Sequence, residues 1–520
     1  DAESDAYMRL WHQALIRRTG SAEPVASYSV RRIKHLGVFS TCECHRRTKC
    51  IWARHITTHS KALAGRAVHG LCTEAGDDSG LPIRIKTRGV PIHLYADPIG
   101  VEEDAIRQLV SIAESGLAEH FVSAMPDVHL GKGAAVGSVY ASKTLVAPNG
   151  VGVDIGCGMA AVPVEKLFRD DLVRDASDGT DGFVKEAKAV QRLIKAKVPT
   201  GADSHLEALK GTAEAISAIS KEHPPSPWLR KLLSANARVA RQLGTLGGGN
   251  HFLEVLYDET GQVWLMLHSG SRWIGNHTAD VYNRKAIDQM RRDGRSPPSG
   301  RSGLNDLNSL RIDSEEGQLY LQDMAWCQAY ALANRRAMLG IMTQIVRDVL
   351  NRRTEDDRMI NTHHNFCQCE RCTVRDPVTG AEVSEELWVT RKGATSARRG
   401  EAGLIPGSMG VGSFVVEGKG ESLSWRSCSH GAGRRLSRTK AFELVSQADF
   451  EASMNGILCD RTEALRDEAP QAYKDLSQVM QDQKSLVSIK HRLHPLINVK
   501  GIEKGSRQKK KGEARRDRKS

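Results

Sequence analysis

The residues best suited to chemistry begin with Asp154 and Cys157, which stand three positions apart in the glycine-rich run GVGVDIGCGM. A carboxylate and a thiolate so close together, on a backbone that glycine allows to turn tightly, suit a divalent metal ion. Further residues of metal-binding type follow in turn-like settings: His251 in LGGGNHFLE, His268 in LHSGSR, His364 in NTHHNF and His430 in SCSHGAGR. A lone histidine is usually structural, but recurrence in one kind of context indicates a single shared site.

Asp154, Cys157, His251, His268 and His364 together exceed the four ligands of a simple zinc site. Shared between two ions, with the thiolate as the bridge, they leave open positions for substrate oxygens. Two neighbouring divalent ions suit phosphoryl or nucleotidyl transfer, because the attacking and the leaving oxygen both carry negative charge. Zinc, manganese and cobalt all fit this set, and the order of affinities alone favours zinc.

His430 stands apart from this set, because the small residues of HGAGR leave room for an incoming phosphorus atom. A neutral imidazole is a competent nucleophile toward phosphorus; the alternatives are a fifth metal ligand or a general acid. Turns suited to binding anions accompany it: GGGN at 247–250, PGSMG at 406–410, HSGSR with Arg272, and MPDVHLGKGAAVGS at 125–138 with Asp127, His129 and Lys132.

Short apolar runs and amphipathic stretches predict the elements that must position these residues. The runs at 137–142, 158–164 and 263–267 predict strands, and the stretches 102–120, 180–198, 228–246 and 319–353 predict helices. Strands and helices do not alternate regularly, so the sequence favours a mixed α+β domain over a doubly wound parallel sheet. Two polar stretches, 284–304 and 367–387, are expected to be loops or insertions.

Composition and charge restrict the classes of function. The 520 residues are 40% hydrophobic and 26% charged, and no apolar run is long enough to cross a bilayer. The net charge of +12 favours an anionic partner such as RNA or DNA, the alternative being a merely basic enzyme. The tail 502–520 holds nine Lys/Arg and three Asp/Glu, hence +6, and is expected to be a disordered nuclear-targeting, RNA-contacting or solubilising end.

The eleven cysteines are unevenly distributed. Single cysteines in apolar surroundings are typical of reduced thiols in an intracellular protein. The cluster CQCERC within 367–387 has nearly the spacing of a zinc knuckle but lacks a fourth ligand nearby, so a surface insertion with free thiols is favoured over a structural zinc. A second cluster, Cys42, Cys44 and Cys50 with His45, lies in residues 1–80, whose weak periodicity indicates a poorly ordered, lineage-specific or organelle-targeting extension.

The ordered motifs of residues 82–501 resemble those of the RtcB family of RNA-splicing ligases. They are MPDVHLGKGAAVGS, GVDIGCGM, GGGNHFLE, LHSGSR, HHNF, RKGAT, LIPGSMG, SCSHGAGRRLSR and INVKG. The resemblance implies an α+β ligase domain over 81–501 with a dinuclear metal and nucleotide cleft. It also implies an enzyme that uses Mn²⁺ and GTP to join RNA 2′,3′-cyclic phosphate or 3′-phosphate ends to 5′-hydroxyl ends, as in tRNA splicing and RNA repair.

The resemblance also implies roles for single residues. Asp154, Cys157, His251, His268 and His364 would hold two Mn²⁺ ions, and His430, with Asp127 near the reaction centre, would accept GMP from GTP. Arg272 would bind an RNA phosphate. The residues implied to contact the nucleotide are Asn250, Phe252, Leu253, Glu254, Asn365, Pro406, Gly407, Ser408, Met409, Ser413, Gly431, Ala432, Gly433 and Lys500.

RNA and GTP are therefore the expected partners, with an activating protein as a further one. The protein is expected to act as a monomer or within a ligase complex, without a membrane, in the cytoplasm or, from its basic termini, in the nucleus or an organelle. Two alternatives stay open: a related metallo-guanylyltransferase that caps or repairs nucleic-acid 3′-phosphate ends, and a non-enzymatic RNA-binding scaffold. A generic metal-dependent phosphatase is a weaker third, because it needs neither GTP nor a nucleophilic histidine.

Overall fold

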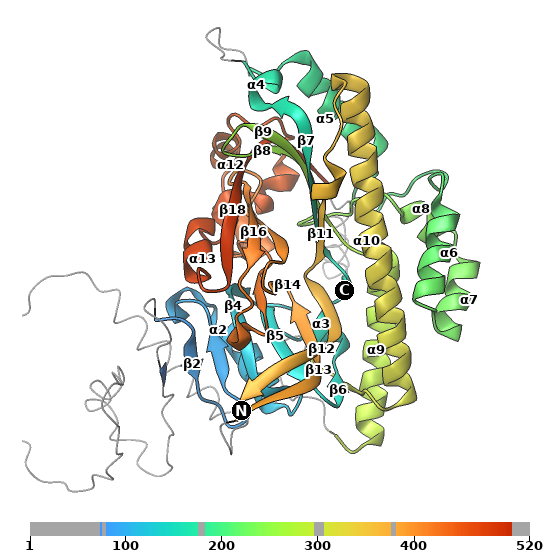
Figure 1. Ribbon diagram of the computed structural model, residues 1–520, viewed down its shortest axis with the longest axis vertical. Helices are drawn as coiled ribbons and strands as arrows, with labels where there is room; N and C mark the ends of the chain where they lie inside the picture. The colour runs from blue at the N-terminus through green and yellow to red at the C-terminus, as the bar shows by residue number, and fades with distance from the viewer. Residues whose placement is uncertain (1–72, 75–79, 175–181, 296–305, 376–380, 502–520) are drawn as a thin grey trace, which may run out of the picture.

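The computed structural model describes residues 73–74, 80–174, 182–295, 306–375 and 381–501. In it two seven-stranded sheets stand end to end, and one long helix, α10 (Glu315–Leu350), runs beside both (Figure 1). The α+β class expected from the sequence is confirmed, as are strands at 137–142, 158–164 and 263–267. The predictions for residues 1–72, for the cysteines among them and for the tail 502–520 concern parts outside the described residues.

The first sheet is almost entirely antiparallel, and its one parallel pair joins β3 to β4. Helix α2 (Glu103–Glu114) connects these two strands and buries its apolar side against them, as a crossover helix does. In sheet order the strands are β1 (Thr73–Glu74), β2 (Ile83–Ile85), β3 (Ile92–Leu94), β4 (Glu119–His129), β5 (Val136–Ser142), β13 (Glu382–Lys392) and β12 (Asn365–Arg375).

The second sheet is antiparallel throughout and curls, because its two end strands, β11 and β15, contact each other. In sheet order its strands are β11 (Ile360–His363), β7 (Gly158–Phe168), β9 (Gln262–Ser269), β8 (Phe252–Tyr257), β18 (Val487–Lys500), β16 (Ser413–Gly418) and β15 (Ala402–Pro406). Two short ribbons complete the strands: β6 (Leu145–Val146) with β10 (Leu310–Arg311), and β14 (Ala394–Ser396) with β17 (Ser427–Ser429).

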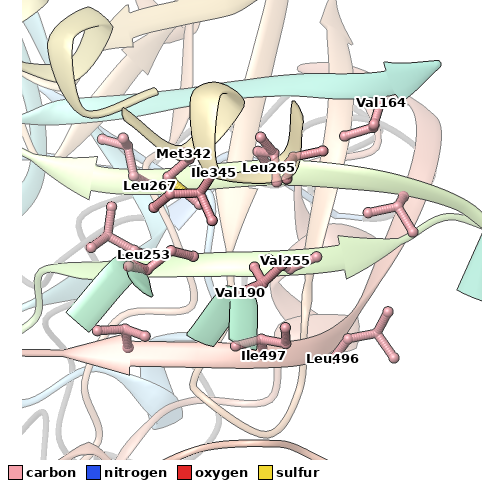
Figure 2. Packing of buried hydrophobic residues seen from close by; sticks show 14 of the residues in the cluster. Val164, Val190, Leu253, Val255, Leu265, Leu267, Met342, Ile345, Leu496 and Ile497 are labelled. Atoms are coloured by element: carbon pink, nitrogen blue, oxygen red, sulfur yellow. The ribbon is translucent and has the colours of Figure 1, made fainter. Parts of the chain in front are cut away.

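The largest apolar cluster lies between the second sheet and the helices that cover it. Figure 2 shows Leu253 and Val255 of β8 and Leu265 and Leu267 of β9 meeting Met342 of α10. Alternate residues of the strands point to this side, and burying such side chains contributes roughly 1.5–3 kcal/mol each. The cluster therefore holds α10 and α5 (Lys185–Lys197) firmly against the strands that carry the site described below.

The remaining helices lie around these layers. Among the described residues, no helix is both long and apolar enough to cross a membrane. The stretch 228–246 forms two helices, not one, and part of 284–304 continues a helix, not a loop. The remaining α-helices are α3 (Pro148–Val151), α4 (Arg169–Leu172), α6 (Thr212–Glu222), α7 (Pro227–Ala235), α8 (Arg238–Gln242), α9 (Arg272–Arg292), α11 (Arg438–Leu444), α12 (Gln447–Ser453) and α13 (Leu476–Asp482).

The prediction of a loop at 367–387 is wrong for the described residues, which belong to the hairpin β12–β13. Strand β13 also pairs with β5, so the hairpin extends the first sheet. Cys367 and Cys372 are buried on it and Cys369 is exposed, and all three are free thiols. The polar residues of this stretch predicted exposure, but Glu370 is buried and its charge is compensated by arginines within the fold. That this stretch is an insertion relative to the family stays a prediction.

Glu370 is the centre of a buried ionic cluster. Its carboxylate lies 2.5 Å from Arg391, which is fully buried, and 3.0 Å from Arg398. Burial pushes the pKa of Glu370 upward, but the two guanidinium groups outweigh burial and hold it below its usual value. The carboxylate therefore stays ionised and compensates a cation that has no access to water.

We expect Glu370→Gln to lower the free energy of unfolding by about 3–5 kcal/mol, because it leaves the buried Arg391 charge uncompensated. Chemical denaturation followed by circular dichroism measures this change. Glu386→Gln, at an exposed position of the same hairpin, is the matched control and should change stability by less than about 0.5 kcal/mol. Equal, small effects of both substitutions would contradict the role given to Glu370.

Candidate metal and nucleotide site

The strand register of the second sheet brings the candidate ligands to one edge. His268, near the end of β9, lies opposite Phe252, the first residue of β8, so His251 stands beside it. Cys157 immediately precedes β7, and its carbonyl accepts a 2.8 Å hydrogen bond from the backbone N–H of His364, which follows β11. Four ligands from distant parts of the sequence thus meet where adjacent strands begin or end.

Contacts between side chains place Cys157 in the middle of the cluster. Its Sγ lies 3.4 Å from Nε2 of His251 and 3.2 Å from Nε2 of His268. Nε2 of His251 also lies 3.1 Å from Oδ2 of Asp154, and Nε2 of His268 also lies 3.2 Å from Nε2 of His364. The structure therefore brings all five predicted ligands together, and Cys157, His251 and His268 form a group able to hold a metal ion.

Backbone carbonyls fix the tautomers of two of these histidines. Nδ1 of His251 donates to the carbonyl of Leu246 at 2.9 Å, and Nδ1 of His268 donates to the carbonyl of Asn250 at 3.2 Å. A carbonyl oxygen only accepts, so the proton is on Nδ1 and the lone pair is on Nε2, which faces the cluster. This second layer of hydrogen bonds is typical of metal-binding imidazoles.

The polar groups of the cluster are suited to binding a cation, because they do not fully satisfy one another's hydrogen bonds. Oδ1 of Asp154 and Nδ1 of His364 are buried polar atoms without a hydrogen-bond partner among the described residues. Burial, and then the charge of Asp154, raises the pKa of the Cys157 thiol well above its usual value, so the thiolate needs a positive charge beside it. A pair of divalent ions would satisfy these clustered acceptors and would stabilise the thiolate of Cys157.

Two glycines allow the close approaches that build the cluster. A Cβ on Gly270 would lie 2.2 Å from Oδ1 of Asp154, so only glycine leaves room for that carboxylate. Gly247 has a φ of +99°, and a Cβ there would lie 2.4 Å from both Arg272 and His251. The glycine-rich character that drew attention to these motifs in the sequence is therefore required sterically.

His430 lies directly beside this cluster, with its ring centroid 4.9 Å from that of His364. Its Nδ1 is 2.6 Å from Oδ2 of Asp127, a fully buried residue of β4. Burial raises the pKa of Asp127, but the neighbouring His430 outweighs it and holds the pKa below its usual value. The ionised carboxylate keeps the proton of His430 on Nδ1 and leaves the Nε2 lone pair available for attack.

A cavity of about 220 Å³ opens next to His430. It has a glycine-rich wall from two segments, and Lys500 of β18 also lines it. Of the residues expected at the nucleotide, the following line it: Asn250, Phe252, Pro406, Gly407, Ser408, Met409, Gly431, Ala432, Gly433 and Lys500. The wall of small residues and backbone amides suits a nucleotide phosphate.

The other residues expected at the nucleotide do not line this cavity. Leu253 points into the apolar cluster because alternate residues of β8 face opposite sides, and Ser413 is buried at the start of β16. Glu254 accepts a 2.6 Å hydrogen bond from Asn498, which does line the cavity, and burial raises its pKa to about 7. Asn365 donates to the carbonyl of Asp154 and so supports the metal cluster.

A second cavity, of about 610 Å³, lies on the other side of Asn250, which lines both. Its lining includes three guanidinium groups, from Arg238, Arg272 and Arg438, next to Asp154 and His251. Arg272 has a φ of +60°, a conformation unfavourable for a residue with a side chain. Such strain is retained at functional sites, and the guanidinium of Arg272 donates hydrogen bonds to Gly201, which lines the cavity, and to buried Thr245.

Two supporting residues escaped the sequence analysis. Arg335 of α10 is fully buried and donates to the carbonyls of Gly156 and Ser269 at 2.8 and 3.0 Å, which ties together the loops around Cys157. Glu468 pairs with Lys500 at 2.6 Å inside the nucleotide cavity. Arg335 lies within an ordinary amphipathic helix and Glu468 ends the short 3₁₀ helix Glu463–Glu468, so neither carries a local signal in the sequence.

The fold and the ligand cluster thus define an α+β protein with a candidate metal centre beside a histidine that lines a glycine-walled cavity. Comparison with known proteins identifies the family: the chain matches the family described as tRNA-splicing ligase RtcB over residues 108–501. The chain therefore belongs to the RtcB family.

Individual relatives agree with this assignment. The chain is 36% identical over 430 residues to RNA-splicing ligase RtcB of Escherichia coli K12, covering 80% of this chain and 99% of that protein. It is 30% identical over 486 residues to tRNA-splicing ligase RtcB of Thermococcus kodakarensis, covering 80% and 96%. For tRNA-splicing ligase RtcB of Methanococcus maripaludis the identity is 29% over 454 residues, covering 77% and 92%.

Proposed function

We propose that this protein is a GTP-dependent RNA ligase. It joins an RNA with a 2′,3′-cyclic phosphate or 3′-phosphate end to an RNA with a 5′-hydroxyl end. The observation that carries the proposal is the position of His430, held by Asp127 at 2.6 Å, beside the five-ligand cluster and in the lining of the glycine-walled cavity. The family membership of the chain and the names of its relatives support the same activity.

In the first step, Nε2 of His430 attacks the α-phosphorus of GTP. The N–P bond forms, the P–O bond to the β-phosphate breaks, and pyrophosphate leaves. Asp127 faces Nδ1 and stabilises the positive charge that develops on the ring. The backbone N–H groups of Gly431 and His430 donate to the same carboxylate oxygen at 3.2 and 3.1 Å, so this geometry is fixed before the nucleotide binds.

In the second step, the RNA 3′-phosphate, obtained by hydrolysis where the end is cyclic, attacks the phosphorus bound to His430. This gives RNA(3′)pp(5′)G and frees the imidazole. In the third step, the 5′-hydroxyl of the second RNA attacks the phosphorus on the RNA side and expels GMP. Activation is needed because a bare 3′-phosphate would otherwise have to expel hydroxide.

The cluster of Asp154, Cys157, His251, His268 and His364 would hold two Mn²⁺ ions in this proposal. When bound, such ions supply positive charge to phosphoryl oxygens during displacement. The nucleotide would occupy the cavity that Lys500 helps to line. Arg272 and Arg238 of the larger cavity would bind RNA phosphates, whereas the third arginine there, Arg438, is paired with Asp467 and Glu468.

The test is ligation by the full chain of a 3′-labelled 5′-hydroxyl RNA to an RNA with a 2′,3′-cyclic phosphate. We expect a joined product with GTP and Mn²⁺, and none with ATP or with Mg²⁺ alone. A 3′-phosphate RNA that gains GMP but never joins the second RNA would identify a capping guanylyltransferase instead. RNA binding without any covalent product, and without labelling of the protein by GTP, would leave only a scaffold and overturn the proposal.

A further inference from the structure

The nucleotide cavity holds a second imidazole that the proposed reaction has not used. His129 is the last residue of β4, is half-buried, and lines the cavity together with His430. Its Nδ1 donates to the backbone carbonyl of Asp127 at 2.9 Å, which places the lone pair on Nε2. Within the described residues, Nε2 of His129 makes no hydrogen bond and is not among the fully buried unpartnered atoms.

Asp127 therefore holds both imidazoles in the tautomer with the proton on Nδ1, one through its carboxylate and the other through its backbone carbonyl. Its carboxylate lies at Nδ1 of His430, and its carbonyl accepts from Nδ1 of His129. The two rings are nearly parallel, inclined by 23°, with centroids 6.3 Å apart. One such nitrogen serves the proposed reaction as the nucleophile, and His129 offers a second unprotonated ring nitrogen in the lining of the same cavity.

Apart from the opening of a cyclic phosphate by water, the proposed reaction has one step in which the nucleophile must lose a proton. The attack of His430 on GTP and the attack of the 3′-phosphate on guanylyl-His430 use nucleophiles without a proton to lose. In the third step a neutral hydroxyl attacks. The bond from the 5′-oxygen to phosphorus forms, the bond from phosphorus to the oxygen of GMP breaks, and one proton must leave. RNA(3′)pp(5′)G and a hydroxyl become a phosphodiester, GMP and this proton.

We propose that Nε2 of His129 accepts the proton of the 5′-hydroxyl in the third step, so that His129 is a second catalytic histidine. This inference rests on the proposed function. It assigns to the two histidines separate chemical tasks: His430 carries the phosphorus, and His129 carries the proton. The resulting imidazolium lies beside the Asp127 carboxylate and releases its proton to water once GMP has left.

The surroundings of His129 keep it in the form that this task requires. Burial, helped by the charges of His430 and Lys474, lowers its pKa to about 4 against the opposing effects of the hydrogen bond to Asp127 and of the Asp127 charge. Lys474 approaches from the far side, where its Nζ donates to the carbonyl of Val128 at 2.7 Å. A diphosphate in the cavity brings opposite charge and raises the pKa again, toward a value at which general-base catalysis is efficient.

The test separates the steps with His129→Asn. The amide N–H₂ of asparagine can replace Nδ1–H as the donor to Asp127, so only the Nε2 function is removed. We expect labelling of His430 by GTP within about threefold of wild type. Sealing of a preformed RNA(3′)pp(5′)G to a 5′-hydroxyl RNA should fall by about 10²-fold, with RNA(3′)pp(5′)G accumulating in the complete reaction. Gel analysis of both labelled species measures the two rates.

The matched control is His120→Asn, at the other end of β4. His120 has a φ of +59°, which asparagine tolerates, and its ring contacts Glu385 far from the cavity. Its variant should carry out both steps at wild-type rates. Equal losses of labelling and sealing in His129→Asn, or undiminished sealing, would overturn the role of His129. Absence of GTP labelling in the wild-type protein is a different result and would overturn the proposed function itself.

Discussion

Replacing His430 with alanine is expected to abolish the transfer of guanylate from GTP to the protein. No other imidazole in the cavity has its Nδ1 proton held by a buried carboxylate, as Asp127 holds that of His430 at 2.6 Å among the described residues. Removal of a nucleophile leaves no route to the covalent intermediate, so the loss should exceed about 10³-fold. Incubation with Mn²⁺ and α-labelled GTP, followed by denaturing electrophoresis, measures the adduct.

The chemistry of the adduct provides a second readout. A phosphorus–nitrogen bond to histidine is labile to acid, whereas an ester to serine would survive. His491→Ala is the matched control, because His491 lies on β18 next to Glu259, outside both cavities. Labelling of His430→Ala at the wild-type level would show that the nucleophile is another residue. A larger loss of GTP labelling in His491→Ala than in His430→Ala would also contradict the assignment.

Sequence alone was sufficient to single out the residues of the cluster, because they lie in short motifs with local signals. Asp154 and Cys157 are neighbours along the chain, and glycines such as Gly270 mark positions where backbone and side chains approach closely. That His251, His268 and His364 belong to the same cluster was an inference from context. The antiparallel register of β7, β8, β9 and β11 supplies the physical cause, since it aligns their ends.

Other features depend on long-range packing and leave no local trace. Arg335 reaches the loops around Cys157 only because α10 is pressed against β7 and β9 by the apolar cluster of Figure 2. The hairpin β12–β13 was expected to be a loop because its residues are polar. The sequence does not reveal that Glu370 is paired with Arg391, since the two residues are 21 positions apart. Local polarity therefore indicates exposure reliably only where no partner is brought in by the fold.

The lining of the nucleotide cavity includes features that the sequence predicts and features that only the fold determines. The glycine-rich segments around Pro406 and Gly431 were predicted from their composition, and the structure places them on its wall. Leu253 was grouped with its neighbours in GGGNHFLE, but the two-residue period of β8 turns it to the opposite face. A motif specifies which segment approaches a ligand, whereas the strand period decides which of its side chains can touch it.

Cys157→Ser is expected to lower the number of bound Mn²⁺ ions from two to one or fewer. Sγ of Cys157 is the atom between the two halves of the cluster, with His251 on one side and His268 on the other. A serine hydroxyl is uncharged and bonds weakly to such ions, so both halves lose their shared ligand. Elemental analysis after gel filtration measures the stoichiometry, and ligation should fall in parallel.

The same loss should appear in the thermal stability of the protein. At a free Mn²⁺ concentration 100 times the Kd, binding stabilises the folded state by about 2.7 kcal/mol per ion, which raises the wild-type Tm. Cys157→Ser should forfeit most of this rise, whereas Cys327→Ser, a buried cysteine that contacts Thr278 on α9, should retain it although its metal-free Tm also falls. An unchanged ion count and an undiminished rise in Cys157→Ser would exclude the thiolate as the bridge, because no other residue of the cluster contacts both halves through one atom.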